Sequence, residues 1–200
     1  LMKSTLQPEI TLLTKFLGLF IAVLVLAQPA VAQNQARSTA DADVPAARPE
    51  DVESVGAILD AVYDVISGPA GEARDWDRMR SLFLPEARLI PSGTAPDGST
   101  RYLVWSLEEY ISTAGGQLEA NGFFEVEAHR LDERFGNIAH VFSTYESYRT
   151  VAEMEAGDHF MRGINSIQLL FDGERWWVLQ IYWQQENPDQ PIPERYLDGE

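Results

Sequence analysis

Apolar side chains recur at helical spacing in three stretches of the chain. Pro49 suits a helix start, and the stop signal Ser67-Gly68-Pro69 closes the first stretch. The repeat in between consists of Val52, Val55, Leu59, Val62 and Ile66. A second helix is predicted over residues 75–84, and a third over 106–118, which a Ser-x-x-Glu capping box opens.

The other apolar positions follow the pattern of strands. Two short strands, 87–91 and 101–105, flank a segment rich in turn residues. Beyond Asn121, four long strands are predicted, over 123–131, 137–149, 160–171 and 175–185. The last two flank Asp172-Gly173, a strong hairpin signal. The order of helix, helix, hairpin, helix and four antiparallel strands indicates an α+β domain.

Residues 1–32 are predicted to form a cleavable secretory signal. Two lysines accompany an apolar run at 16–27, and Ala30-Val31-Ala32 supplies the small residues of a cleavage site. A permanent membrane anchor is the alternative, but the run is shorter than the roughly 20 apolar residues that span a bilayer. We therefore expect a periplasmic or secreted protein with no stable membrane association after cleavage. The expected organisation is a signal at 1–32, a flexible leader at 33–49, a domain at 50–187 and a tail at 188–200.

The chain is strongly acidic. It has 15 Lys and Arg against 31 Asp and Glu, a net charge of −16, and removal of residues 1–32 with two lysines and one glutamate makes it −17. Such a surface repels phosphate backbones, so no nucleic-acid partner is expected. There is no cysteine, which excludes disulfides, thiol nucleophiles and cysteine–zinc sites.

Two stretches resemble a known family. Arg162–Asn187, RGINSIQLLFDGERWWVLQIYWQQEN, ends like the terminal strand of bacterial ketosteroid isomerases. Phe135–Tyr148, FGNIAHVFSTYESY, resembles exported bacterial proteins of the NTF2-like and SnoaL-like type. With the order of elements, these stretches make residues 50–187 similar to the NTF2-like superfamily. The resemblance implies a cone-shaped α+β fold in which three N-terminal helices pack on a strongly curved antiparallel sheet.

The resemblance does not extend to the isomerase reaction. Tyr63 falls at the place of a tyrosine on the first helix of the isomerases. The positions of their two working carboxylates are occupied here by Pro91 and Ile167. Because that mechanism needs a base and an oxyanion donor, we reject steroid isomerisation by this route.

Strand alternation predicts which side chains line the cone. If Ile167 faces inward, then Trp176, Gln180 and Tyr182 point outward. The expected pocket lining consists of Trp177, Leu179, Ile181, Trp183, Ile167 and Met161. Such walls suit a flat apolar ligand. The alternative is that these side chains simply fill the core.

Polar residues supply candidates for chemistry. His129, His140 and His159 fall on different strands without the local spacing of metal ligands, so neither a metal site nor a cofactor is expected. His140, Tyr63 and Asn165 are the candidate catalytic residues for an enzyme of the dehydratase, cyclase or hydrolase type. The alternative for His140 is a hydrogen-bonded histidine at a strand edge.

Aromatic residues expected on the outer sheet face predict a homodimer. Trp176 and Tyr182 would form an apolar patch too large for an isolated domain, and NTF2-like domains commonly pair through that face. The competing idea is that the tail Pro188–Tyr196 covers the patch.

The function expected first is binding of a small apolar molecule in the cone pocket. An enzyme, or a non-catalytic interaction domain with a filled cone, are the alternatives.

Overall fold

The structure is a computed structural model, and it describes residues 38–39, 42–95 and 97–197. The predicted signal at 1–32 lies outside the described residues, as does part of the predicted leader. Within the described ranges, no helix is long and apolar enough to cross a membrane.

The predicted helices are present, with local differences. The helical segments are α1 (Pro49–Val52), α2 (Val55–Ile66), α3 (Trp76–Leu82), α4 (Leu107–Tyr110), the π-helical η2 (Ile111–Gly115), α5 (Gly116–Asn121), α6 (Val151–Ala156) and the 3₁₀ turn η3 (Glu194–Tyr196). The first predicted helix is divided at Ser54, because its side chain accepts a hydrogen bond from the Ala57 N–H and starts α2 anew. The capping box of Ser106 and Glu109 is confirmed. Helix α6 was not predicted.

Six strands form one sheet. They are β1 (Phe83–Thr94), β2 (Thr100–Tyr102), β3 (Phe124–Phe135), β4 (Ile138–Tyr148), β5 (Met161–Phe171) and β6 (Trp176–Gln185). Their order is β2-β1-β6-β5-β4-β3. The strands β3 to β6 pair antiparallel as predicted, and β1 adds one parallel pair by lying next to β6. A parallel neighbour is available to β1 because the chain returns to it only after eight further elements.

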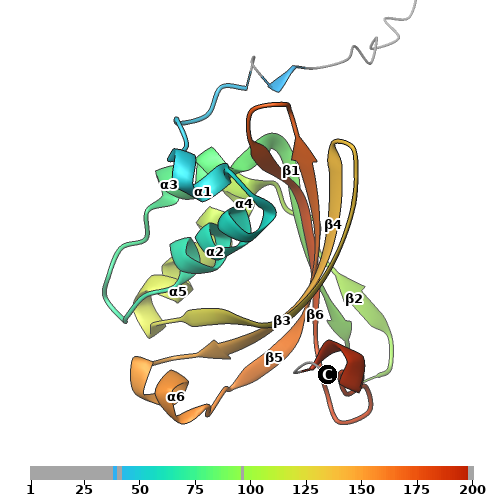
Figure 1. The fold of residues 1–200 in the computed structure, drawn as a ribbon. Coiled ribbons are helices and arrows are strands. Elements are labelled where there is room, and N and C mark those ends of the chain that lie inside the picture. Colours follow the sequence, from blue (N-terminus) through green and yellow to red (C-terminus); the bar gives the residue numbers. More distant parts are fainter. Residues whose placement is uncertain (1–37, 40–41, 96, 198–200) are drawn as a thin grey trace, which may run out of the picture. The chain divides into compact units, whose positions relative to one another are not determined.

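The helices cover one face of a curved sheet, and the core lies between these two layers (Figure 1). Helix α2 contributes Ile58, Leu59 and Val62, which are buried against sheet residues such as Val141 and Ile167. Burying one such side chain stabilises the fold by about 1.5–3 kcal/mol. The α+β class and the packing of N-terminal helices on a curved sheet are therefore confirmed.

A β-bulge in β6 changes which side chains of this strand face the helices. Leu169 pairs with Val178, whereas the preceding residue Gln168 pairs with Gln180, so Leu179 has no partner in the register. Residues before the bulge are therefore shifted by one position relative to a regular alternation. Beyond the bulge, Ile181 faces the helices as predicted.

The shift overturns three assignments at the start of β6. Trp176 was expected to point outward, but it is only 9% exposed and belongs to the core. Trp177 was expected in the pocket, but its indole N–H donates to Asp172 at 2.6 Å and its ring stacks under the Arg175 guanidinium at 3.7 Å. Leu179, also expected in the pocket, is 44% exposed.

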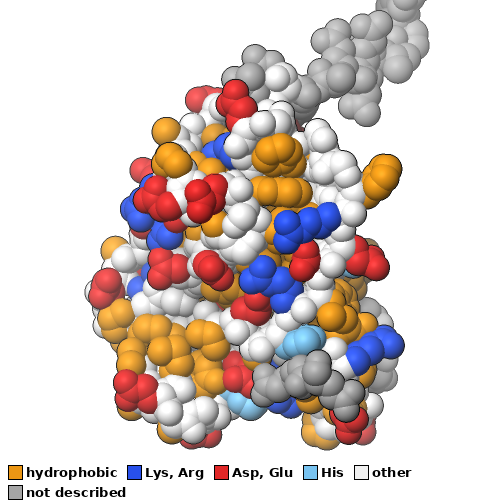
Figure 2. All heavy atoms as spheres, in the orientation of Figure 1, with side chains coloured by type: hydrophobic (Ala, Val, Ile, Leu, Met, Phe, Trp, Pro, Cys, Tyr) orange, Lys and Arg blue, Asp and Glu red, His pale blue; other side chains and the backbone are white. Residues whose placement is uncertain are grey.

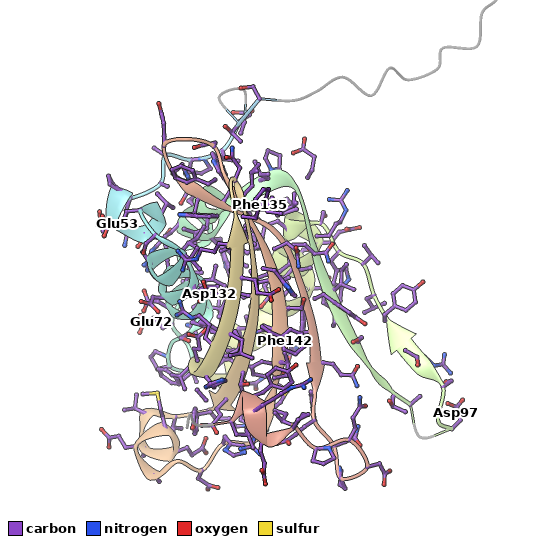
Figure 3. The ribbon with its side chains drawn as sticks, turned by 45° about the vertical axis from the view of Figure 1, so that its right-hand side comes forward. Glu53, Glu72, Asp97, Asp132, Phe135 and Phe142 are labelled. Carbon is purple, nitrogen blue, oxygen red and sulfur yellow. The ribbon has the colours of Figure 1, made fainter. Side chains whose placement is uncertain are left out.

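The C-terminal tail lies on the sheet face opposite the helices. The ring of Tyr196 packs on Phe142 with centroids 5.0 Å apart, and the Thr144 hydroxyl donates to the Tyr196 carbonyl. Ile192 of the tail is 9% exposed. Figure 3 shows Phe142 on this face, close to the C-terminal segment. The structure thus has the arrangement in which the tail covers part of the outer face.

Candidate functional site

A cavity of about 200 Å³ lies between the helices and the sheet. Its lining is mostly apolar and aromatic, and it is formed by Val62, Ile66, Met79, Leu89, Tyr110, Leu118, Phe123, Glu125, Tyr145, Met161, Asn165, Ile181 and Trp183. The rings of Tyr110 and Trp183 meet edge to face at 6.4 Å. Only a few polar groups interrupt these walls, and they come from β3, β4, β5 and the end of α4.

Glu125 is the acidic group of the cavity. Strand β3 carries it, and its carboxylate accepts hydrogen bonds from the Asn165 Nδ2 at 3.2 Å and the Ser147 hydroxyl at 3.2 Å. Burial raises the pKa of Glu125 to about 7, although these two hydrogen bonds act in the opposite direction. The carboxyl group therefore exchanges its proton near neutral pH.

A chain of hydroxyl and amide groups extends from Glu125 to Glu127. Asn165 also donates its Nδ2 to the Tyr63 hydroxyl at 3.1 Å, and the Tyr63 and Ser143 hydroxyls are 2.6 Å apart. The Ser143 hydroxyl in turn donates to Glu127. Burial raises the pKa of Tyr63 above its ordinary value, so the phenol is neutral. This network fixes the orientation of Asn165 and thereby of the Glu125 carboxylate.

Tyr145 lines the cavity and carries an unpartnered hydroxyl. It is 1% exposed, and its oxygen has no hydrogen-bond partner among the described residues. Its ring lies over Gly163 of β5, where a Cβ would stand 2.5 Å from the hydroxyl oxygen. A buried hydroxyl without a partner is costly, by about 1–3 kcal/mol. Because Tyr145 lines the cavity, a molecule bound there is the candidate for the missing partner.

A second hollow of about 430 Å³ lies on the outer side of Glu125. Its walls are formed by Asp60, Tyr63, Asp64, Ser67, Phe124, Glu125, Val126, Glu127 and Met154, and we call it the acidic cleft. Figure 2 shows acidic side chains over the helical side of the molecule. Since Glu125 lines both the cavity and the acidic cleft, its carboxyl group stands at the boundary between them.

The predicted catalytic residues do not form one group. Tyr63 and Asn165 are hydrogen-bonded to each other, as a shared site requires. His140 lies on the opposite face of β4, where its Nε2 is 3.1 Å from the Ser166 hydroxyl and its ring meets Phe142. The prediction that His140 and Asn165 share one catalytic site is therefore wrong, because alternate residues of a strand point to opposite faces of the sheet.

The predicted pocket residues are divided in a similar way. Met161, Ile181 and Trp183 line the cavity. Ile167 is fully buried in the core on the helical side of the sheet but is not part of the cavity wall. Trp177 and Leu179 lie away from the cavity because of the bulge in β6.

Sequence reasoning missed Glu125, Tyr145 and Tyr110. A signal for Glu125 was present in the sequence. Glu125 lies two residues after the apolar Phe123 on a predicted strand, so the two side chains share a face. Tyr145 was not among the predicted pocket residues. Its pairing opposite Gly163 could not be derived without the register of β4 and β5.

Comparison with known proteins yields matches among solved structures alone. No protein-family profile matches the chain, and no curated protein does. An NTF-2-like protein of unknown function from Silicibacter pomeroyi DSS-3 is 13% identical over 67% of this chain and 94% of its own, with a TM-score of 0.46. A ketosteroid isomerase-like protein from Parabacteroides distasonis ATCC 8503 is 14% identical over 68% and 91%, with a TM-score of 0.43.

A third solved structure, a protein of unknown function with a cystatin-like fold from Nostoc punctiforme PCC 73102, is 10% identical over 70% of this chain and 92% of its own, with a TM-score of 0.49. At these identities the likeness concerns the fold and leaves the activity open. The matched structures include NTF2-like and ketosteroid isomerase-like proteins.

Proposed function

We propose that the cavity binds a small molecule with an apolar body and one polar group. The observation that carries the proposal is the Tyr145 hydroxyl, which is buried without a partner in a mostly apolar wall. Buried polar groups in folded proteins are almost always hydrogen-bonded. The Glu125 carboxyl borders the same cavity, so a ligand with one polar group would find both a hydroxyl and a carboxyl.

The size of the cavity limits the ligand. A cavity of about 150 Å³ accommodates benzene in a protein core, whereas drug-sized ligands occupy about 300–1,000 Å³. The cavity here, at about 200 Å³, corresponds to one ring with a short substituent. Burial of such a molecule is favourable by about 25 cal/mol per Å² of apolar surface.

A matched pair of leucine variants tests the proposal. Leu118 lines the cavity from α5, and Leu118→Trp places a larger ring into it. Leu179→Trp makes the same change at an exposed site on β6. We expect calorimetry with benzyl alcohol to show binding to the wild type and to Leu179→Trp, and a loss of about ten-fold or more for Leu118→Trp. Binding unaffected by Leu118→Trp would contradict the proposal. No binding to any of the three proteins would favour a filled interaction domain.

Acid–base catalysis is the second candidate function. It is favoured by the pKa of Glu125, which burial raises to about 7, where a carboxyl can both donate and accept a proton. Glu125 would take the role that the sequence assigned to His140, with Asn165 and Tyr63 as positioning residues. The test is the rate at which the hydrogens on the carbon next to the carbonyl of cyclohexanone exchange with solvent, measured by NMR. Equal exchange rates with wild-type protein and with Glu125→Gln would exclude this role.

A further inference from the structure

The cavity is aromatic on several sides. Trp183 of β6, Tyr110 of α4, Tyr145 of β4 and Phe123 all contribute to its wall. The faces of aromatic rings carry partial negative charge and attract cations, an effect of about 2 kcal/mol or more where water is excluded. Walls of this kind favour an organic cation over a neutral molecule of the same shape.

Glu125 is an acid without a cationic partner. Among the described residues that line the cavity or the acidic cleft, none carries a positive charge. The neighbouring Glu127, in contrast, is paired with Arg130 at 2.6 Å, and Asp64 with Arg78. A buried carboxylate without a cation is costly, and a cation that enters the site removes that cost.

The acidic cleft gives a cation a favourable approach. Asp60, Asp64 and Glu127 line the acidic cleft together with Glu125. The chain as a whole has a net charge of −16, so anions are repelled and cations are concentrated near the surface. Because Glu125 lines both hollows, a ligand whose ammonium group contacts the carboxylate could place its apolar part in the cavity.

We infer that the cavity takes an organic ammonium ion, a small amine with an apolar body, with the Glu125 carboxylate as its counter-charge and the Tyr145 hydroxyl as a hydrogen-bond acceptor for its N–H. This inference rests on the proposed function and names its ligand class. A neutral carbonyl compound is the competing ligand. It would need a proton on Glu125, whereas the ammonium ion needs the carboxylate, so the two respond to pH in opposite directions.

Other titratable groups around Glu125 do not reverse this response. Tyr63, Tyr110 and Tyr145 face it from α2, α4 and β4, and burial raises the pKa of each above its ordinary value, so all three are neutral. On the cleft side, Asp60, Asp64 and Glu127 face it from α2 and β3. From α6, the packed side chain is the uncharged Met154. The proton that moves near neutral pH is thus that of Glu125.

Benzylamine and benzyl alcohol form a test pair, because they differ little in shape but only the amine is cationic. At about pH 8 we expect calorimetry to show benzylamine bound about ten-fold more tightly than benzyl alcohol. Benzylamine affinity should increase from about pH 6 to about pH 8 as Glu125 loses its proton. Benzyl alcohol affinity should stay level or fall over that range.

Two charge-removing variants complete the experiment. Glu125→Gln keeps the shape of the side chain and should lower benzylamine affinity about ten-fold while changing that of benzyl alcohol about two-fold at most. Glu133→Gln, on an exposed part of the same strand, should change neither. If benzyl alcohol binds as tightly as benzylamine in the wild type, the ammonium inference is overturned and the proposed function stands. If neither binds, the proposed function itself fails. Should Glu125→Gln not fold, the wild-type pH dependence still decides.

Discussion

Glu125 has its carboxyl group among apolar and neutral polar side chains, and it therefore resists ionisation. The folded protein holds its proton up to about pH 7, whereas the ordinary glutamate value is 4.5. Between these two pH values, the folded state binds a proton that the unfolded state has lost. The free energy of unfolding must accordingly fall as the pH rises through this range, because stability follows the difference in bound protons.

Replacement of Glu125 by glutamine should remove this pH dependence. Between about pH 4.5 and about pH 7, we expect the wild type to lose free energy of unfolding on the order of 2–3 kcal/mol from this group. Glu125→Gln resembles the protonated side chain and should lose much less. Urea denaturation at the two pH values measures the difference, with Glu133→Gln as an exposed control on β3. An equal decrease in the free energy of unfolding for the wild type and for Glu125→Gln would show that Glu125 has an ordinary pKa in the folded protein.

At the scale of residues, the sequence predicted part of the site. Tyr63 and Asn165 were named, and they are hydrogen-bonded neighbours. Tyr63 was assigned through the family resemblance and Asn165 through strand alternation, and neither argument needs knowledge of distant contacts. Tyr145 was not predicted in the pocket, since its burial depends on the small Gly163 on the neighbouring strand. His140 was grouped with residues from which a whole sheet layer separates it.

At the scale of elements, local patterns predicted the strands and hairpins well but not the facing of β6. The alternation Trp177, Leu179, Ile181, Trp183 holds only after the bulge, so its second half is right and its first half is wrong. A bulge inserts one residue without any fixed sequence signal. The aromatic residues around it can lie on either face of the sheet, so their pattern does not reveal the bulge. Helix α6 was missed because it is a six-residue turn of helix between Thr150 and Gly157 without an apolar repeat.

Gly163 links the β5–β6 pairing to the shape of the cavity. A Cβ at this position would stand 2.4 Å from the Gln184 carbonyl oxygen and 2.5 Å from the Tyr145 hydroxyl. We expect Gly163→Ala to lower the free energy of unfolding by at least about 2 kcal/mol, because one contact is with backbone that cannot move aside. Gly93→Ala on β1, where a Cβ would meet no atom within 4 Å, should change it by less than about 0.5 kcal/mol. Chemical denaturation compares them, and similar values for both would refute the close approach.

At the scale of the whole molecule, the order of elements predicted the α+β class, and the resemblance implied that the N-terminal helices pack on the sheet. The parallel pairing of β1 with β6 was not predicted. It joins segments some ninety residues apart, and no turn sequence connects them directly, so no local pattern indicates the pairing. The export signal at 1–32 stays a prediction, as does the homodimer. The structure adds a competitor for the dimer, since the tail occupies part of the face through which a second copy would pair.

The tail leaves other apolar side chains on that face uncovered. Leu179 and Tyr182 of β6 are 44% and 43% exposed, while Phe142 of β4 is shielded by Tyr196. If the tail were detached, the exposed apolar area would grow from β6 across to β4, and such patches favour association. Self-association of this protein should therefore be limited by its own C-terminal segment, residues 188–197.

A substitution that detaches the tail should increase association. Ile192 is a buried residue of the tail itself, and Ile192→Asp places a charge there that has no partner. We expect sedimentation equilibrium at tens of micromolar to show a larger dimer fraction for Ile192→Asp than for the wild type. Tyr102→Asp, at a site 67% exposed on β2, adds the same charge elsewhere and should leave the wild-type distribution unchanged. A wild type that is fully dimeric, with Ile192→Asp dissociated into monomers, would show instead that the tail itself belongs to the dimer interface. In that case the second copy would pair over the tail rather than in its place.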